Sequence, residues 1–379
     1  MPVKATDEQI KSALAEFNGV RIKAARKLKL TGRGLQLRIA RMQARGIELP
    51  ESEYHHCDRA EYLQRGVTGT STLYDADGTP KLQWVKTATG KLDREQVIAI
   101  TREAFGDIPP ARVVPRVATG SGKSLLTVYP IGDQHVGMYA WGEEAGDDYD
   151  IKISERLLLS AVTHLVEIAP ASDEALIVDV GDFLHYDTIR AETTRSHNQL
   201  DADSRYHAMI RSALRLMRAC VDAALTKHRR VSVICTPGNH NDMGAAWMSE
   251  ALALFYSGNA RVNIYRHAGK FHYYEFGKVL LGVTHGDTGK PEKLAGVMAA
   301  DQPEAWGRTL HRHWLTGHVH HRAVIEMQGV LWETFRTLAA KDAWAAAAGY
   351  RSGRDMTAIV FHKEHGEIAR HRFDVSMLK

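Results

Sequence analysis

Five short clusters of aspartate, asparagine and histidine lie between residues 133 and 320, and each follows a run of apolar residues. A carboxylate and an imidazole two positions apart on an extended segment point to the same side and can reach one ion. Such mixed oxygen and nitrogen donors suit Mn²⁺, Fe²⁺, Zn²⁺ or Ni²⁺ better than Mg²⁺ or Ca²⁺. The clusters are Asp133-Gln134-His135, Gly181-Asp182 with His185 and Asp187, Gly238-Asn239-His240, His285-Gly286-Asp287 and Gly317-His318-Val319-His320.

The apolar runs before the clusters predict the strands that position them. LLTVYPI, ALIVDV, VSVIC, KVLLGV and HWLT are short, rich in Val, Ile and Leu, and typical of buried strands. Helical periodicity over 154–169, with Ser154 as the expected N-cap, and over 203–228 separates several of them. Because α/β sheets place functional groups at the carboxyl ends of their strands, we expect the clusters to meet. The second helix should bury Met209, Ala213, Leu216, Cys220 and Leu225.

Taken together, the five clusters resemble the calcineurin-like metallophosphoesterase superfamily, whose pattern is D-x-H, G-D, G-N-H, His and G-H-x-H in that order. Chance surface groups rarely produce five ordered matches, each after an apolar run. The resemblance implies an α/β fold, an αββα sandwich over residues 121–379. It also implies two divalent transition-metal ions, most often Mn²⁺ with Fe, Zn or Ni as alternatives, and phosphoester hydrolysis.

The resemblance assigns metal-binding roles to seven residues. Asp182 would bridge two ions about 3.5–4 Å apart, and a water bridging the ions would become the nucleophile. The remaining residues divide into a set for the first ion and a set for the second. These sets are Asp133, His135 and His320, and Asn239, His285 and His318.

Residues next to the ligands have other implied roles. His240 would approach the scissile phosphate, where it stabilises charge or protonates the leaving oxygen. Three further residues would orient the ligating imidazoles. They are His185, Asp187 and Asp287.

Two features depart from the family pattern. Asn241 stands directly after His240, where the family commonly has an acid, and Asp242 follows one position later. The second cluster lacks the D-R-G ending of the Ser/Thr protein phosphatases, whose arginine grips a phosphoryl group. It has GDFLH instead, closer to the repair-nuclease branch, which argues against a protein phosphatase.

The first 50 residues form a basic module. They hold 11 Lys and Arg against 4 Asp and Glu, a net charge of +7, whereas the remaining residues hold 38 against 41, a net charge of −3. This asymmetry predicts a polyanionic partner. Helices are expected over 7–17, over 20–28 and from the N-cap Thr31 onward, with a turn at Asn18-Gly19.

This stretch resembles the Fis-type helix-turn-helix family, with the pattern A-A-x-x-L-x-[apolar]-[Ser/Thr]-x-x-x-L. Lys29 occupies the turn position where that family usually has Gly. The matching residues are Ala24, Ala25, Leu28, Leu30, Thr31 and Leu35. The residues that would face the DNA major groove are Arg33, Gln36, Leu37 and Arg38, and both arginines are expected to be exposed.

Residues 51–120 form a middle region with a hairpin over 71–87 turning at Asp77-Gly78, a helix over 93–105 and a proline-rich linker over 108–116. ATGSGKS at 118–124 resembles a phosphate-binding loop, but Val117 replaces its first glycine and an expected strand follows it. The insertion 188–205 carries three arginines and His197. It is equally compatible with a loop that contacts substrate phosphates and with a solvated lid. Near the C-terminus a hairpin should turn at His365-Gly366.

The composition, 44% apolar and 25% charged over 379 residues, is typical of a soluble globular protein. Neither a signal peptide nor a membrane span is evident, which predicts a cytoplasmic location, and three cysteines without C-x-x-C spacing argue against a disulfide framework. The whole arrangement resembles phage- and prophage-encoded metallophosphoesterases, hence a bacterial or phage-infected cell. The sequence is compatible with a homodimer but does not set the oligomeric state.

Three functions follow from these features. A DNA-directed phosphodiesterase or nuclease, with DNA bound through residues 1–50, accounts for both the clusters and the basic module. The alternative enzyme is a phosphomonoesterase or nucleotide phosphodiesterase with small substrates. An inactive DNA-binding regulator is disfavoured, because a degenerate site usually loses one or more ligands.

Overall fold

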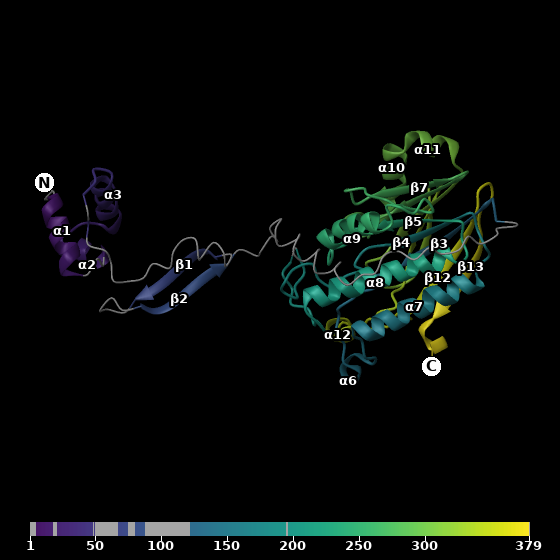
Figure 1. Ribbon diagram of the computed structural model, residues 1–379, viewed down its shortest axis with the longest axis horizontal. Helices are drawn as coiled ribbons and strands as arrows, with labels where there is room; N and C mark the ends of the chain where they lie inside the picture. The colour runs from purple at the N-terminus through teal and green to yellow at the C-terminus, as the bar shows by residue number, and fades with distance from the viewer. Residues whose placement is uncertain are drawn as a thin grey trace. The chain divides into compact units, whose positions relative to one another are not determined.

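The computed structural model describes residues 5–17, 21–47, 49, 67–74, 80–87, 122–194 and 196–378. The chain divides into two compact units, Met1–Asp93 and Arg94–Lys379 (Figure 1). The turns expected at Asn18-Gly19 and Asp77-Gly78, the helix over 93–105 and the linker over 108–116 lie outside the described residues.

The first unit begins with three short helices, α1 (Asp7–Glu16), α2 (Arg21–Lys27) and α3 (Gly32–Gln43). Thr31 caps α3, as expected: its hydroxyl accepts a hydrogen bond from the Gly34 amide at 3.1 Å. The helices share a small apolar core whose members include Ile10, Ala24 and Leu35. The predicted helical module is therefore present, and its cohesion comes from this core.

Lys29, between α2 and α3, has a φ of 51°, in the left-handed region that favours glycine. We expect Lys29→Gly to stabilise the helical module by about 0.5–1 kcal/mol, because glycine adopts this φ without a Cβ clash. Amide hydrogen exchange in α2 and α3 of the full-length protein should slow by about two- to fivefold. The control, Lys23→Gly at an exposed position of α2, should speed exchange instead, and equal acceleration by both changes would contradict the expectation.

Two strands follow, β1 (Val67–Tyr74) and β2 (Pro80–Thr87), which pair antiparallel with Ser71 opposite Trp84. The predicted hairpin is confirmed, although its first strand begins four residues earlier than the expected start at residue 71.

The second unit contains two sheets. The six-stranded sheet has the order β13-β12-β3-β4-β5-β6, in which β3 to β6 run parallel and β12 pairs antiparallel with β3 and β13. Its strands are β3 (Leu125–Ile131), β4 (Glu174–Asp179), β5 (Arg230–Cys235), β6 (Val262–Ile264), β12 (Asp355–His362) and β13 (Gly366–Asp374). The hairpin expected at His365-Gly366 is thus confirmed.

The five-stranded sheet has the order β10-β11-β9-β8-β7. Its strands are β7 (His272–Phe276), β8 (Val279–Val283), β9 (His311–Thr316), β10 (Ala323–Met327) and β11 (Val330–Thr334). All five strands predicted before the metal-type clusters are confirmed as β3, β4, β5, β8 and β9. A strand, rather than a helix, follows residues 118–124, so this segment lacks the context of a phosphate-binding loop.

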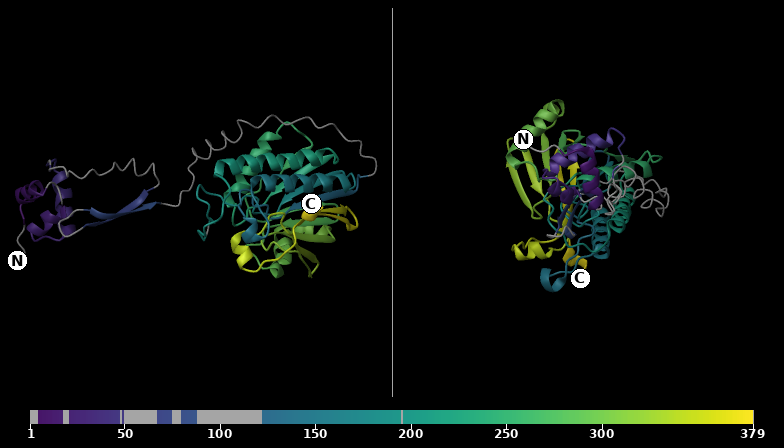
Figure 2. Two further views of the ribbon diagram at one scale, coloured as in Figure 1. Left: turned by 90° about the horizontal axis from the view of Figure 1, so that it is seen from below. Right: turned by 90° about the vertical axis from the view of Figure 1, so that its left-hand side faces the viewer.

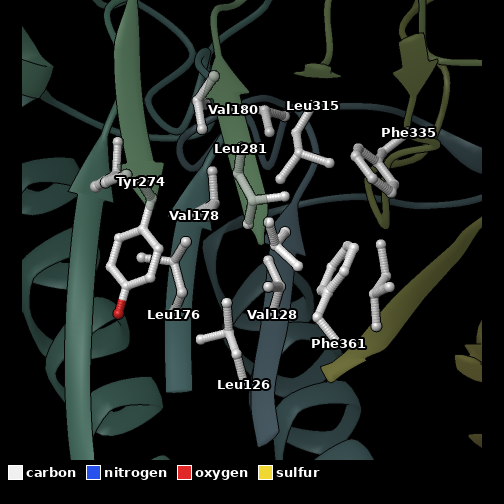
Figure 3. Packing of buried hydrophobic residues seen from close by; sticks show 14 residues of the cluster. Leu126, Val128, Leu176, Val178, Val180, Tyr274, Leu281, Leu315, Phe335 and Phe361 are labelled. Carbon is white, nitrogen blue, oxygen red and sulfur yellow. The ribbon is translucent and has the colours of Figure 1, made fainter. Parts of the chain in front are cut away.

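The main core lies between the two sheets (Figure 3). Leu126, Leu176 and Val178 from one sheet meet Leu281 and Leu315 from the other, all of them buried. Burying two apolar sheet faces against each other is the main source of stability in such a sandwich.

Helices cover both outer faces. Three of them, α7 (Ile151–Ile168), α8 (Tyr206–Leu225) and α9 (Asp242–Phe255), pack on the six-stranded sheet, and Figure 2 shows α7 and α8 on one side with the second sheet on the other. Two more, α10 (Pro291–Asp301) and α11 (Pro303–Arg308), pack on the five-stranded sheet through Trp314 and Val330. The expected αββα sandwich is confirmed. The remaining elements are α6 (Gly142–Ala145), α12 (Ala343–Ala347) and a 3₁₀ turn (Val375–Leu378).

The start of α7 corrects one expectation. Its N-cap is Asp150, whose carboxylate accepts a hydrogen bond from the Ile153 amide at 2.7 Å, and not Ser154. Ser154 lies inside the helix, where its hydroxyl accepts a hydrogen bond from buried Gln134 at 2.9 Å. In α8 the inward face is as predicted, because Met209, Ala213, Leu216, Cys220 and Leu225 are all buried. Among the described helices, none is both long and apolar enough to cross a membrane.

Candidate metal centre

The first predicted ligand set meets at one point. Asp133 and His135 follow β3 and His320 follows β9, and each offers a donor atom within 4.8 Å of the other two. His320 Nε2 lies 3.2 Å from His135 Nε2 and 3.4 Å from Asp133 Oδ1. Two imidazole nitrogens and a carboxylate oxygen that converge in this way are a donor set for one transition-metal ion.

The second predicted set meets beside it. Two of its members, His285 and His318, offer donor atoms within 4.8 Å of each other and of Asp182, the predicted bridging residue. His285 Nε2 lies 3.1 Å from Asp182 Oδ2 and 3.0 Å from Asn239 Oδ1. All seven residues are thus gathered at the carboxyl ends of the strands, while their roles as ligands remain predictions.

The backbone is bent sharply at these residues. Five residues of the two sets have positive φ angles, between 36° and 70°, and elsewhere among the described non-glycine residues only Lys29 and His197 do. Such conformations cost about 1–3 kcal/mol each and persist where the surrounding structure enforces them, often at functional sites. The five are Asp133, His135, Asp182, His318 and His320.

Glycines leave room for the ligands to approach the backbone. A Cβ on Gly238 would lie 2.0 Å from Asp182 Oδ1, and one on Gly317 would lie 2.4 Å from Asp133 Oδ2. These distances are too short for any Cβ. Glycine is therefore required at both positions, because a carboxylate lies against the backbone there.

Hydrogen bonds fix the orientation of the donors. The His285 ring donates from Nδ1 to the Val180 carbonyl at 3.0 Å, which directs Nε2 toward the centre. The His318 amide donates to both Asp133 oxygens, at 2.9 and 3.0 Å, and the His240 amide donates to Asp182 Oδ1 at 2.8 Å. The carboxylates are therefore held before any ion binds.

The charges of the carboxylates and the histidines are coupled in this site. Burial lowers the pKa of His285, but Asp182 and Asp133 raise it to about 10, so a metal ion would have to displace a proton from this imidazole. Burial, together with the neighbouring histidines His240, His320 and His185, lowers the pKa of His135 well below its ordinary value, so its imidazole is neutral. Burial alone would raise the pKa of the Asp182 carboxyl, but His285 lowers it well below its usual range, so it is ionised. Neutral imidazole and ionised carboxylate are the forms that coordinate metals.

His240 stands beside the first set. Its ring donates from Nδ1 to the His185 carbonyl at 2.7 Å and lies edge-on to the His135 ring, with ring centres 4.8 Å apart. Donor atoms of His135, His185 and His240 also lie within 4.8 Å of one another, so a histidine cluster extends from the first ligand set. The non-ligand role expected for His240 remains a prediction.

The three predicted orienting residues have different surroundings. His185 is buried, with Nδ1 3.3 Å from His135 Nδ1, and it touches a candidate ligand directly. Asp187 accepts hydrogen bonds from the Tyr206 hydroxyl and from the Met243 and Gly244 amides, so it anchors the start of α9. Asp287 accepts a hydrogen bond from Lys270 at 3.2 Å.

Asn241, Thr337 and Lys270 take part in the site although the sequence did not single them out for it. Asn241 is fully buried, and its side-chain oxygen accepts from the amides of Asp182 at 3.1 Å and Gly238 at 2.9 Å. Thr337 donates to the Asp133 carbonyl at 2.7 Å. The position of Asn241 next to the third cluster was a usable signal, whereas Thr337 had none.

The insertion 188–205 reaches the third cluster. The Thr194 hydroxyl donates to the Asn239 carbonyl at 3.0 Å, and Glu192 pairs with Gln199 across the loop. The insertion therefore borders the second predicted ligand set.

The residues predicted to read DNA lie on α3. Gln36 and Leu37 are exposed, and the side chain of Arg33 is outside the described part. Arg38 is half-buried and donates a hydrogen bond to the Ala5 carbonyl, so the expectation that Arg38 is exposed is wrong. Its guanidinium ties α3 to the start of the chain.

Comparison with known proteins finds no matching family model and no matching curated protein. Among solved structures, the chain is similar to a predicted phosphoesterase from Streptococcus pneumoniae (11% identity, TM-score 0.28, covering 67% of this chain and 99% of that one). It is also similar to Vps29 complexed with zinc from Entamoeba histolytica (13%, 0.26, 65% and 98%) and to a dimetal phosphatase from Danio rerio (10%, 0.34, 66% and 98%). TM-scores below 0.5 carry no functional weight, so the chemistry has to be inferred from the side chains of this chain.

Proposed function

We propose that the protein is a metal-dependent phosphodiesterase that acts on DNA. The observation that carries the proposal is the convergence of two donor sets, Asp133, His135 and His320 beside Asp182, His285 and His318 with Asn239. The ends of five strands, β3, β4, β5, β8 and β9, supply these groups, and a shared ligand accounts for the meeting of five strained residues at one place.

The residues present fit a pair of transition-metal ions. Imidazole nitrogens and carboxylate oxygens are mixed in each set, Asp182 contacts His285, and the absence of a Cβ at Gly238 and Gly317 leaves room for the carboxylates of Asp182 and Asp133. When bound, such a pair supplies a nucleophile at neutral pH and neutralises charge on the phosphate oxygens.

The residue of this chain that would contact and protonate the substrate is His240. The hydrogen bond from Nδ1 to the His185 carbonyl leaves His240 Nε2 as the ring atom available to a substrate oxygen. From that position His240 can stabilise charge on the phosphate or give a proton to the leaving oxygen. No arginine of the D-R-G type accompanies Asp182, which favours a diester substrate over a phosphoprotein.

The basic module supports DNA as the substrate. Residues 1–50 carry +7 against −3 for the rest of the chain, and α3 exposes Gln36 and Leu37. Binding through phosphates releases counterions, so affinity depends steeply on salt. The module would bring duplex DNA to a body whose own charge repels it at long range.

Deleting residues 1–50 tests the proposal. With Mn²⁺, the full-length and the truncated protein should hydrolyse a chromogenic diester at equal rates, because every predicted ligand lies beyond residue 130. Duplex binding should weaken, and the slope of log affinity against log salt, about −4 to −5 for four to six phosphate contacts, should flatten. Fluorescence anisotropy at several salt concentrations measures both.

Single substitutions in the full-length protein provide the control. Arg33→Ala should reproduce part of the loss of affinity, whereas Lys11→Ala, which removes an exposed charge from α1, should change it little. Substitution of Arg38 is not a suitable test of DNA binding, because its guanidinium donates a hydrogen bond to the Ala5 carbonyl within the module. Equal affinity and slope for truncated and full-length protein would favour the enzyme with small substrates, and failure of both to cleave the diester would overturn the phosphodiesterase.

A further inference from the structure

Exposed aromatic side chains are confined to one region among the described residues. The exposed fractions are 45% for Tyr139, 50% for Trp141, 70% for Trp344 and 46% for Tyr350, and every other exposed large apolar side chain there is aliphatic. We call these four residues the aromatic surface. Single exposed apolar side chains are common, but exposed aromatic side chains that are grouped on neighbouring segments mark a binding surface.

The four rings belong to two segments that pack together. Tyr139 and Trp141 lead into α6, and Trp344 and Tyr350 lie in and after α12, which contacts α6 (Figure 1). Ala140 and Ala145 share an apolar cluster with Ala339 and Ala340 beneath the surface. The centres of the Trp344 and Tyr350 rings are 5.8 Å apart, and the ring planes are inclined by 32°. A hollow of about 410 Å³ between α6 and α12 is lined by neighbouring residues of these segments, not by the four rings themselves.

Both segments are continuous with the metal centre. Tyr139 is four residues after His135, so their Cα atoms are at most about 14 Å apart. The Met138 amide also donates to the His135 carbonyl at 3.0 Å. On the other segment, Thr337 donates to the Asp133 carbonyl and accepts from the Ala339 amide at 2.8 Å. A polymer with one phosphate at the centre therefore has the aromatic surface within reach of neighbouring units.

The charges around the hollow indicate how such a polymer binds. Lys341 and Arg351 line it together with Glu143 and Glu144, so the net charge is close to zero. The Arg351 guanidinium donates to the Tyr350 backbone carbonyl at 2.7 Å and to the Ala346 carbonyl at 3.1 Å, which ties it to the main chain there. A balanced surface gives the phosphate backbone of a single strand or a duplex little attraction, so binding here would depend on the ring faces, which can stack on unpaired bases.

We propose that the aromatic surface stacks the unpaired bases of single-stranded nucleic acid and so holds a substrate strand beside the metal centre. The proposal rests on the proposed function, because it names the form of nucleic acid that the centre would cleave. Bases in an intact duplex are stacked on each other and cannot reach these rings. The substrate class is therefore a single strand, or a duplex with an unpaired stretch.

The test uses the full-length protein and a labelled oligodeoxythymidylate of about eight nucleotides, a length within the range for single-strand sites. Anisotropy is measured in EDTA, so that binding is separated from hydrolysis. The double variant Trp141→Ala, Trp344→Ala should bind about tenfold more weakly or worse, the loss expected when stacked rings are removed. Trp344→Phe should retain most of the affinity, because its ring can still stack.

Leu310→Ala is the matched control, since Leu310 is 67% exposed and lies outside the aromatic surface. It should leave affinity within about twofold. Thermal melting and hydrolysis of a chromogenic diester should be unchanged in every variant. If the wild-type protein bound the oligonucleotide but cleaved no diester, the proposed phosphodiesterase function would be wrong. The proposal that the aromatic surface stacks bases would still hold.

Two results would overturn the stacking proposal. One is equal oligonucleotide affinity for the double variant and the wild type. The other is a loss of self-association in sedimentation by the double variant with no loss of oligonucleotide affinity, which would assign the aromatic surface to a second copy of this chain.

Discussion

Asp182→Ala should strip the protein of bound metal and reduce diester hydrolysis by roughly four powers of ten or more. Asp182 is buried, with Oδ2 3.1 Å from His285 Nε2 and Oδ1 accepting the His240 amide, and it is the predicted bridging ligand. Both ions would lose their shared carboxylate at once. Metal content after Mn²⁺ loading and dialysis, measured by mass spectrometry, and turnover of a chromogenic diester give the two readouts.

His240→Ala is the informative contrast. It should retain both ions and lose roughly two to four powers of ten in kcat, the range for a positioned acid or charge stabiliser. If His240→Ala emptied the site as Asp182→Ala does, His240 would be a ligand together with His135 and His185, whose donor atoms cluster with it. Full metal content and full activity in Asp182→Ala would refute the assignment of the bridging residue.

The parts of the site that the sequence predicts have local determinants. Each cluster consists of an apolar strand, a turn and donor residues within a few positions, and glycines such as Gly238 are needed because a ligand approaches the backbone there. The parallel arrangement of β3, β4 and β5 then brings the carboxyl ends of these strands to one edge of the sheet, where the clusters that follow them meet. The sandwich and the gathering of the clusters could therefore be anticipated from short segments.

The supporting contacts could not be anticipated in the same way. Asn241 holds the Asp182 amide across 59 positions, and Thr337 holds the Asp133 carbonyl across 204. Ser154 has the residue type of a cap, but a hydrogen bond from Gln134 places it inside α7 and leaves capping to Asp150. Arg38 has the type of a DNA contact, yet its guanidinium binds the Ala5 carbonyl. The role of such a polar residue depends on partners that are distant in the sequence, and a local sequence pattern does not identify those partners.

Gly238→Ala is expected to lower diester turnover by about 100-fold or more without unfolding the protein. The added Cβ would lie 2.0 Å from Asp182 Oδ1 and 2.7 Å from the Asp182 amide nitrogen, so the bridging carboxylate has to move. Asn241 accepts from the Gly238 amide, so the turn cannot shift without losing this hydrogen bond. A displacement of about 1 Å at a reacting group is enough for a loss of this size.

Gly296→Ala provides the matched control, because an added Cβ there meets nothing within 4 Å and Gly296 lies inside α10. Alanine should leave turnover unchanged and stabilise the helix by about 0.5–1 kcal/mol. Circular dichroism melts and metal content complete the comparison. Wild-type turnover and metal content in Gly238→Ala would mean that the turn accommodates a side chain and that Asp182 is not held where the donor sets meet. Reduced turnover with reduced metal content, in a protein that melts normally, would instead identify close packing of Gly238 on Asp182 as the reason glycine stands before the Asn239-His240 pair.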